Sequence, residues 1–470
     1  MKKIKFIYVM ICFLLCLIPS AGLLVFHSEN TGKEEHETLP SPVENGTINV
    51  NYLPELGSYF EDSFALRSWY IDADATIMDR VFHKSNNDSV VVGKNGWLYY
   101  SSSLDDYLGR NVLSDRGIYN IENNLSLLEE YVRSRGAEFL FTITPNKNTL
   151  YGENMPDEYQ IKMSGEKNLT KLEERLKESS LSYCSLYDAF SQQDEVLYLK
   201  KDSHWNNKGA LLAYDTLLSR MGYAHDIYET TKVIRTKTNV GDLNAMLYPA
   251  TSGEKTEWNY DYQFEKNYTF EGENDEVEDD WLVTDNQKEQ KSLLMFRDSF
   301  GDTLIPFFSN AFGKAYYSKA ANYNIEKLMD EYAPEYVIAE KVERNISEYA
   351  RTPSVMEAPK RTVDQSVIQN AESDTTIRFE NSEADADYFE IAGVLDPSVV
   401  SDTSDVYVKV TDGDRSDIYE AFTLTDDESD NGYLMYLQKG NVQSTSLGIE
   451  IIVKNGDTFT SVASDTLEAK

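Results

Sequence analysis

The sequence predicts an α/β domain built on a mainly parallel sheet, with an apolar helix before it and an all-β domain after it. Three observations lead to this prediction. Apolar runs typical of strands alternate with helical periodicity between residues 117 and 341. The first residues form an apolar stretch, and after about residue 359 short alternating runs are separated by turn residues.

Residues 1–26 are predicted to be a membrane anchor. Three lysines precede an apolar run from Phe6 to Phe26, which as a helix rising about 1.5 Å per residue is long enough to cross a bilayer. The basic flank places the N-terminus in the cytoplasm. A cleaved signal peptide is the alternative, because residues 20–22 are small, but the run continues to Phe26. We therefore expect a single-pass cell-membrane protein with its bulk outside the cytoplasm, or a secreted protein.

The net charge excludes nucleic acid as a partner, and the cysteine content excludes disulfides as a source of stability. The net charge of -36 makes nucleic acid an unsuitable partner, because a phosphate backbone would be repelled. Cys184 is the one cysteine beyond the N-terminal segment, so no intrachain disulfide stabilises the exported part. Residues 27–54 are polar and contain prolines, which suits a linker.

Residues 55–358 are interpreted as the α/β domain. Apolar residues at steps of three and four predict a helix over 117–135, ended by Gly136. The stretch from 230 to 291 is charged and rich in aromatic residues, and we interpret it as an insertion. The other predicted strands cover 138–144, 182–190, 195–200, 293–296, 315–318 and 335–341, and the other helices cover 169–177, 208–222, a segment from about 303, and 325–332.

Residues 371–470 are predicted to form an acidic β-sandwich of about seven strands, because short alternating runs are separated by turns such as DGD and NG. All five tryptophans precede this domain. If it binds a glycan, tyrosines must provide the stacking surfaces, and the candidates are Tyr388, Tyr407, Tyr419, Tyr433 and Tyr436.

The stretch KDSHWNNK, residues 201–208, contains the first candidate site. Asp202 and His204 lie two residues apart in an extended segment, so the carboxylate can accept the Nδ1 proton and leave Nε2 free as a base. The segment runs from the predicted strand VLYLK into a helix that Asn206 or Asn207 can cap. Such strand-to-helix turns lie at the carboxyl edge of a sheet, where open α/β folds place their sites. A structural Asp-His pair is the alternative.

The stretch LLMFRDSFGD, residues 293–302, contains the second candidate. Ser299 follows an apolar strand and precedes a helix, so it is expected on a tight turn at the same edge. There it can act as a nucleophile, with its own N–H and that of Phe300 binding an oxyanion. Alternatively, Asp298 or Ser299 only caps the helix.

Four motifs in order, GKNGWLYY, KDSHWNNKGA, GDLNAML and RDSFG, resemble the SGNH-hydrolase-like proteins of alginate O-acetylation, the AlgJ and AlgX group and related DHHW proteins. The resemblance covers residues 56–345. It implies a permuted SGNH fold that transfers acetyl groups to a secreted polysaccharide, with Asp202 orienting, His204 as base and Ser299 as nucleophile. Ser203 occupies the second position of DHHW, which departs from that pattern.

The resemblance implies an extracytoplasmic O-acetyltransferase that acts on a polysaccharide acceptor and needs no cofactor. It also implies a membrane-bound O-acyltransferase partner that supplies acetyl. Two alternatives stay open. One is a carbohydrate esterase, in which water replaces the sugar. The other is a catalytically silent glycan-binding or scaffold protein of polysaccharide export.

Weaker candidates surround these motifs. We expect that Asn146, Lys147, Trp205 and Arg297 contribute to substrate binding, with a simple turn or packing as the alternative. A metal site is not expected, because Asp202 and His204 provide only two ligands. Glu340 and Arg344 are expected to form a surface ion pair.

Overall fold

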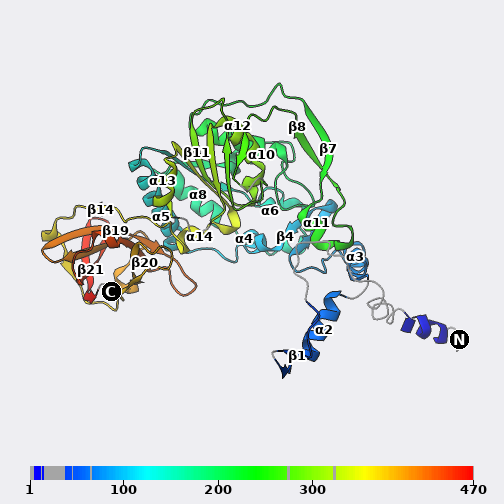
Figure 1. Ribbon diagram of the computed structural model, residues 1–470, viewed down its shortest axis with the longest axis horizontal. Helices are drawn as coiled ribbons and strands as arrows, with labels where there is room; N and C mark the ends of the chain where they lie inside the picture. Colours follow the sequence, from blue (N-terminus) through cyan, green and yellow to red (C-terminus); the bar gives the residue numbers. More distant parts are fainter. Residues whose placement is uncertain are drawn as a thin grey trace.

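The computed structural model describes residues 5–11, 13–14, 38–44, 46–63, 66–272, 276–320 and 324–468. Two large sheets dominate it (Figure 1). Most of the predicted membrane segment, residues 1–4, 12 and 15–26, lies outside the described residues. Among the helices of the described part, none combines the length and apolar character needed to cross a membrane.

The first sheet has seven strands in the order β6-β5-β13-β11-β12-β10-β9. The five strands from β6 to β12 are mutually parallel, β10 runs antiparallel to β12, and β9 runs antiparallel to β10. The predicted mainly parallel α/β sheet is therefore confirmed. Its strands are β6 (Tyr183–Ser185), β5 (Glu138–Thr144), β13 (Tyr336–Val342), β11 (Ser292–Phe296), β12 (Lys314–Ser318), β10 (Trp281–Asp285) and β9 (Thr269–Glu271).

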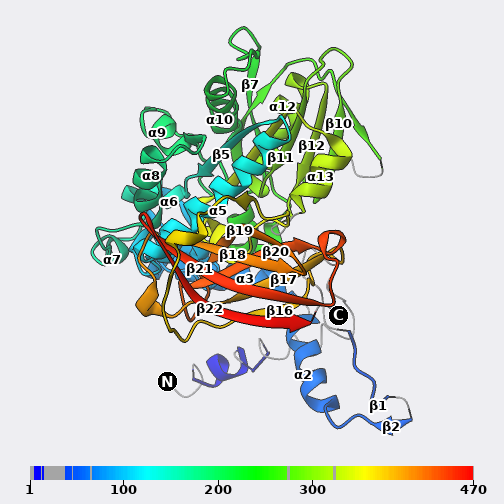
Figure 2. The same ribbon diagram turned by 90° about the vertical axis from the view of Figure 1, so that its left-hand side faces the viewer.

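Helices cover both faces of this sheet (Figure 2). Alternate residues of one strand enter two different cores: Leu293 and Met295 of β11 join one, and Leu294 and Phe296 join the other. This alternation follows from the strand period of two. The first core includes α9 (Leu186–Ser191), α10 (Asn207–Arg220) and α12 (Ile305–Ala311); the second includes α5 (Asp115–Ser134), α8 (Asn168–Glu178), α13 (Ile325–Tyr332) and α14 (Glu348–Arg351).

Three predicted elements differ from the structure. Residues 195–200 are not a strand of the sheet, and only Tyr198 pairs, in an isolated bridge with Trp205. Within 182–190 the strand ends at Ser185, whose side chain caps α9. The expected insertion forms the hairpin β7 (Val233–Asn239) and β8 (Glu257–Tyr262) and the helix α11 (Asp242–Leu247), but it also contributes β9 and β10 to the main sheet.

Shorter elements surround the sheet. They are β1 (Val43–Glu44), β2 (Thr47–Ile48), α2 (Tyr52–Ser63), α3 (Arg67–Ile77), β3 (Val90–Val92), β4 (Leu98–Tyr100), α4 (Leu104–Leu108), α6 (Lys147–Leu150) and α7 (Asp157–Gln160). The strands β3 and β4 flank residues 93–96 of the GKNGWLYY motif and pair antiparallel.

The second sheet confirms the β-rich C-terminal region. It contains nine strands: β14 (Lys360–Arg361), β15 (Gln369–Asn370), β16 (Arg378–Asn381), β17 (Tyr388–Val394), β18 (Asp405–Asp412), β19 (Arg415–Leu424), β20 (Gly432–Gln438), β21 (Ser446–Asn455) and β22 (Thr458–Glu468). Residues of β17 and β20 share one core with residues of β18 and β21, so the sheet folds over on itself at β19. The exact domain boundaries stay predictions.

The tyrosines proposed for sugar stacking lie inside this β-rich region. Each is at most 6% exposed: Tyr388, Tyr407, Tyr419, Tyr433 and Tyr436. Their rings pack in three different hydrophobic clusters, where no ligand reaches them. The idea that these side chains bind a glycan is therefore wrong.

Buried asparagines of α5 join the two sheets. Asn124 donates from Nδ2 to Thr423 O (2.9 Å) and to Tyr349 O (2.8 Å), and its Oδ1 accepts from Thr423 N (3.0 Å). One turn earlier, Asn120 donates to Thr425 Oγ1 (2.9 Å). These amides satisfy backbone groups of β19 and its end that would otherwise be buried without partners.

Replacing Asn124 by alanine should destabilise the protein by about 2–4 kcal/mol, because it leaves several buried backbone groups without partners. Urea unfolding followed by circular dichroism measures this loss. Ser126→Ala on the same helix is the control. Ser126 contacts Glu122 at 3.2 Å, and its loss should change stability by less than about 0.5 kcal/mol. Equal stability of the two variants would contradict the role assigned to Asn124.

Candidate active site

A buried lysine binds the backbone of the loop that carries Asp202 and His204. Lys147, at the start of α6, donates from Nζ to Asp202 O (2.6 Å), Leu199 O (3.1 Å) and Lys200 O (3.1 Å). At the far end of the loop, Asn206 caps α10 by accepting from Lys208 N and Gly209 N, each at 3.0 Å. The expected cap is therefore confirmed at Asn206. Lys147 therefore fixes the start of the loop and Asn206 fixes its end, although no strand of the main sheet leads into the loop.

The turn of Ser299 follows β11 and is held by the half-buried carboxyl group of Asp298 and the buried carboxyl group of Glu340. Asp298 Oδ1 accepts from Phe300 N (2.9 Å), and Asp298 Oδ2 accepts from Val342 N at the end of β13 (2.8 Å). Glu340 on β13 accepts from Asp298 N (3.1 Å). Because β11 and β13 are parallel neighbours, these contacts bind the turn to the carboxyl edge of the sheet.

The structure brings the three predicted side chains together. His204 Nδ1 lies 2.8 Å from Asp202 Oδ1, and His204 Nε2 lies 2.8 Å from Ser299 Oγ. The side chain of His204 is 24% exposed and that of Asp202 is 11% exposed, so a substrate can reach the imidazole while the carboxylate stays covered. The geometry matches that of a nucleophile, a base and a residue that orients the base.

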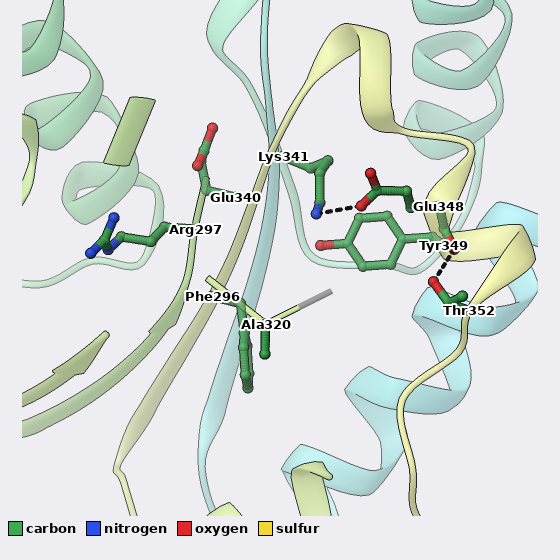
Figure 3. A pocket seen from close by; sticks show the side chains of 8 residues that line it. All are labelled: Phe296, Arg297, Ala320, Glu340, Lys341, Glu348, Tyr349 and Thr352. Atoms are coloured by element: carbon green, nitrogen blue, oxygen red, sulfur yellow. Dashed lines mark hydrogen bonds and ion pairs between the residues drawn. The ribbon is translucent and has the colours of Figure 1, made fainter. Parts of the chain in front are cut away.

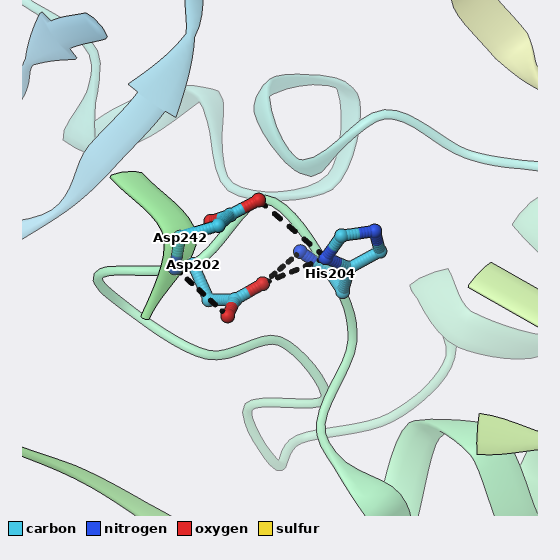
Figure 4. A group of neighbouring side chains, drawn as sticks. All are labelled: Asp202, His204 and Asp242. Carbon is cyan, nitrogen blue, oxygen red and sulfur yellow. Dashed lines mark hydrogen bonds and ion pairs between the residues drawn. The ribbon is translucent and has the colours of Figure 1, made fainter. Parts of the chain in front are cut away.

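A second carboxylate, missed in the sequence, lies beside the imidazole. Asp242 at the start of α11 places Oδ2 3.6 Å from His204 Nδ1 (Figure 4). It also accepts from Ser203 N (2.7 Å) and from the Ser203 hydroxyl, while its own N–H donates to Asp202 Oδ2 (3.2 Å). The signal available in the sequence was the motif GDLNAML, which contains this aspartate.

The two carboxylates change how His204 titrates. Burial alone would lower the pKa of His204, but the hydrogen bond and charge of Asp202 and the charge of Asp242 outweigh it, so the pKa is raised. Burial would raise the pKa of Asp202, yet its bonds to His204 keep that pKa low. For Asp242, burial and the charge of Asp202 raise the pKa. The imidazole is thus a stronger base than an ordinary histidine.

Glu340 and Arg344 do not form the expected surface ion pair. Glu340 is fully buried, where it accepts from Thr144 Oγ1 (2.5 Å). Burial and the charge of Asp298 raise the pKa of Glu340 to about 8. Arg344 instead lies over the ring of Phe300, 5.8 Å from its centroid.

Four side chains predicted to bind substrate are buried, and they bind other groups of the protein. The exposed fractions are 1% for Asn146, 5% for Lys147, 1% for Trp205 and 2% for Arg297. Trp205 donates to Thr303 Oγ1 (2.5 Å), and Arg297 donates to Val277 O (3.0 Å) and Asp279 O (2.8 Å). This placement corrects the prediction, because these side chains hold the loops and present no surface to a sugar.

The predicted oxyanion site is reduced to one donor. The Phe300 N–H is engaged by Asp298, so it does not point at a substrate. Within the described ranges, the Ser299 N–H has no acceptor and is free to bind an oxyanion.

Two further polar groupings lie at or near the site. Asp202, His204 and Asp242 offer ligand atoms within 4.8 Å of one another, but their mutual hydrogen bonds account for this spacing. A separate polar pocket at the same sheet edge is lined on one side by Arg297 and Glu340 and on the other by Lys341, Glu348 and Tyr349 (Figure 3). Lys341 and Glu348 are paired at 2.7 Å. His204 and Ser299 do not line this pocket, so we do not place the reaction there.

Residues 90–294 match the family model described as SGNH hydrolase-like domain, acetyltransferase AlgX. The match confirms the resemblance seen in the motifs. It covers less than half of the 470 residues and includes Asp202, His204 and Asp242, but it ends before Ser299. Among curated proteins, no sequence matches the chain.

Solved structures with low similarity include proteins of the same group. A DHHW family protein from Eubacterium siraeum is 15% identical with a TM-score of 0.41, over 55% of this chain and 95% of that one. PatB1 of Bacillus cereus is 15% identical with a TM-score of 0.42, over 55% and 98%. AlgX of Pseudomonas aeruginosa is 12% identical with a TM-score of 0.34, over 81% and 91%. These likenesses are weak, and we base no argument on them.

Replacing Asp242 by asparagine should move the acidic limb of the pH profile to lower pH. Hydrolysis needs the neutral imidazole, and the charge of Asp242 raises the pKa of His204. Removing that charge lowers the pKa, so the base persists in more acidic solution. The measurement is kcat/KM for 4-nitrophenyl acetate against pH. Asp261→Asn, on exposed β8, is the matched control and should leave the limb in place. A limb that stays or moves upward in Asp242→Asn would refute the coupling.

Proposed function

We propose that this chain is an O-acetyltransferase that moves acetyl groups through an acyl-serine to hydroxyls of a secreted or cell-surface polysaccharide. The observation that carries the proposal is the chain of contacts from Asp202 through His204 to Ser299, with 2.8 Å at both steps. The match of residues 90–294 to an acetyltransferase family supports the same chemistry.

In the first step Ser299 takes the acetyl group from a donor ester. His204 Nε2 accepts the hydroxyl proton, and Oγ attacks the acetyl carbon while the Ser299 N–H binds the oxyanion. The ester bond of the donor then breaks, and His204 returns the proton to the leaving alcohol. Asp202 holds the Nδ1 proton throughout and stabilises the imidazolium.

In the second step the acyl-serine is consumed. A sugar hydroxyl gives its proton to His204 Nε2 and attacks the acetyl carbon, and Ser299 Oγ leaves with that proton. General base catalysis of this kind contributes about two to four powers of ten in rate. If water attacks instead, the same site is an esterase.

The location and partners are part of the proposal. The lysine-rich start followed by the apolar run to Phe26 supports a single-pass anchor in the cell membrane, with the catalytic domain outside the cytoplasm. Cytosolic acetyl donors are on the other side of such a membrane. A membrane-bound O-acyltransferase that passes acetyl across is therefore the proposed source.

Ser299→Ala should abolish acetyl transfer, with a loss of at least about a thousandfold, because the nucleophile is removed. The assay supplies an acetyl ester and a polysaccharide acceptor and measures acetylated sugar and free acetate separately. Peptide mass spectrometry of the wild type, quenched during turnover, should find acetyl on Ser299.

Ser101→Ala provides the control, since Ser101 lies outside the site on the short turn after β4. It should transfer acetyl at the wild-type rate. Free acetate without acetylated sugar would favour the esterase. Unchanged turnover in Ser299→Ala, with a normal melting curve, would refute the assignment of the nucleophile.

A further inference from the structure

An exposed basic and aromatic face lies on the β7–β8 hairpin, next to the site. The antiparallel register pairs Arg235 with Tyr260 and Lys237 with Trp258. Directly opposed residues of two strands point to the same side, so these four side chains share one face. Figure 1 shows the hairpin at the right of the main sheet, away from the C-terminal sheet.

This face combines an exposed indole with two cations. Trp258 remains 50% exposed, although burying an indole is normally favourable. Two cations flank its ring, with Arg235 Cζ 5.6 Å and Lys237 Nζ 5.7 Å from the ring centroid. Within the described part of the chain, Arg235 and Lys237 have no acidic partner at ion-pair distance. An exposed indole beside two unpaired cations can stack on a sugar ring and bind an anionic group on it.

Acidic side chains of the hairpin lie on its other side. Glu257 and Asp261 alternate with Trp258 and Tyr260 along β8, so they point away from this face. The net charge of -36 does not cancel the local attraction, because charges farther than about 8 Å are largely screened at physiological ionic strength. The face is therefore locally cationic on a strongly anionic protein.

Hydrogen bonds connect the hairpin to both ends of the His204 loop. Lys200 N donates to Glu257 Oε2 (2.7 Å) before the loop. After it, Asn207 N donates to Asn259 Oδ1 (2.8 Å) and Asn207 Nδ2 donates to Tyr260 O (2.8 Å). These contacts fix the hairpin to the segment that carries His204, and the side chains of Glu257 and Asn259 make them from the side of β8 opposite to Trp258 and Tyr260.

We propose that this face, Arg235, Lys237, Trp258 and Tyr260, binds the acceptor polysaccharide and selects an anionic one. The inference rests on the proposed function for the acceptor being a polysaccharide. Trp258 stacks on a sugar ring, and Arg235 and Lys237 bind carboxylate or phosphate groups of the polymer. The face explains how a chain of high negative charge retains an anionic substrate.

The test measures binding by calorimetry with the full-length chain in neutral detergent, without an acetyl donor. The probes are an oligogalacturonate and the same oligomer with its carboxylates methyl-esterified. The wild type should bind the charged oligomer at least about tenfold more tightly at low salt, because cations contact its carboxylates. This preference should shrink as salt rises. A phosphomannan fragment tests phosphate as the anionic group.

Variants separate the charges from the ring. Arg235→Gln/Lys237→Gln should remove the preference for the charged oligomer, and Trp258→Ala should weaken both oligomers by about fivefold. The matched controls are Arg110→Gln/Lys162→Gln, which removes two exposed cations elsewhere, and Trp69→Ala, whose indole is 60% exposed. Both controls should bind like the wild type, and melting curves establish that every variant is folded.

Three results would overturn the inference: no preference for charge in the wild type, equal losses in the control variants, or equally tight binding of poly-L-glutamate. Because binding is measured without turnover, the two proposals fail separately. Charge-selective binding with no acetyl on Ser299 would contradict the acetyltransferase and keep the binding face. Acetyl transfer without a preference for the charged oligomer would support the acetyltransferase and contradict the binding face.

Discussion

The contact between His204 Nε2 and Ser299 Oγ is the constraint on which the site depends. It joins residues 95 positions apart on two loops that belong to no common strand pair. Neither loop can hold its side chain in place alone, since Asp202, His204 and Ser299 lie outside the strands and α-helices. The protein solves this with buried groups: Lys147 binds three carbonyls around Asp202, and Asp298 ties the Ser299 turn to β13.

These supports place several ionisable groups where water does not reach. Glu340 is fully buried, and burial and the charge of Asp298 raise its pKa to about 8. Burial lowers the pKa of Lys147 to about 7, against the charges of Asp202 and Asp242, which raise it. The buried supports therefore fix the loops at the carboxyl edge of the sheet, and the charges there favour a basic His204. Buried polar networks of this kind add specificity only when each member has a partner.

The C-terminal sheet and the hairpin show opposite uses of aromatic residues. In the C-terminal sheet the tyrosines are buried in packing: Tyr419 and Tyr433 lie in the core of the sheet, Tyr388 and Tyr436 in the core shared with α5, and Tyr407 in a small cluster with Ile418 and Ile452. On the β7–β8 hairpin Trp258 lies on the outer face and stays 50% exposed. Composition did not show which aromatic rings are buried and which are exposed. The number of aromatic residues says little about binding until the strand faces are known.

Much of this protein follows from its sequence alone. Periodicity placed α5, β5, β11, β12 and β13 near their observed positions, because apolar spacing reflects which side of an element is buried. The motifs around Asp202, His204 and Ser299 identified the three side chains that meet.

Tertiary structure decided what local patterns do not encode. The apolar segment VLYLK pairs through a single residue, because neighbours from β4 and α6 take its backbone groups. Lys147, Trp205 and Arg297 look like ligands in the sequence but are buried as supports, and Asp242 reaches His204 only because the chain folds back 40 residues later. Burial and long-range contacts depend on the whole fold, so only the structure shows which polar residues face a substrate.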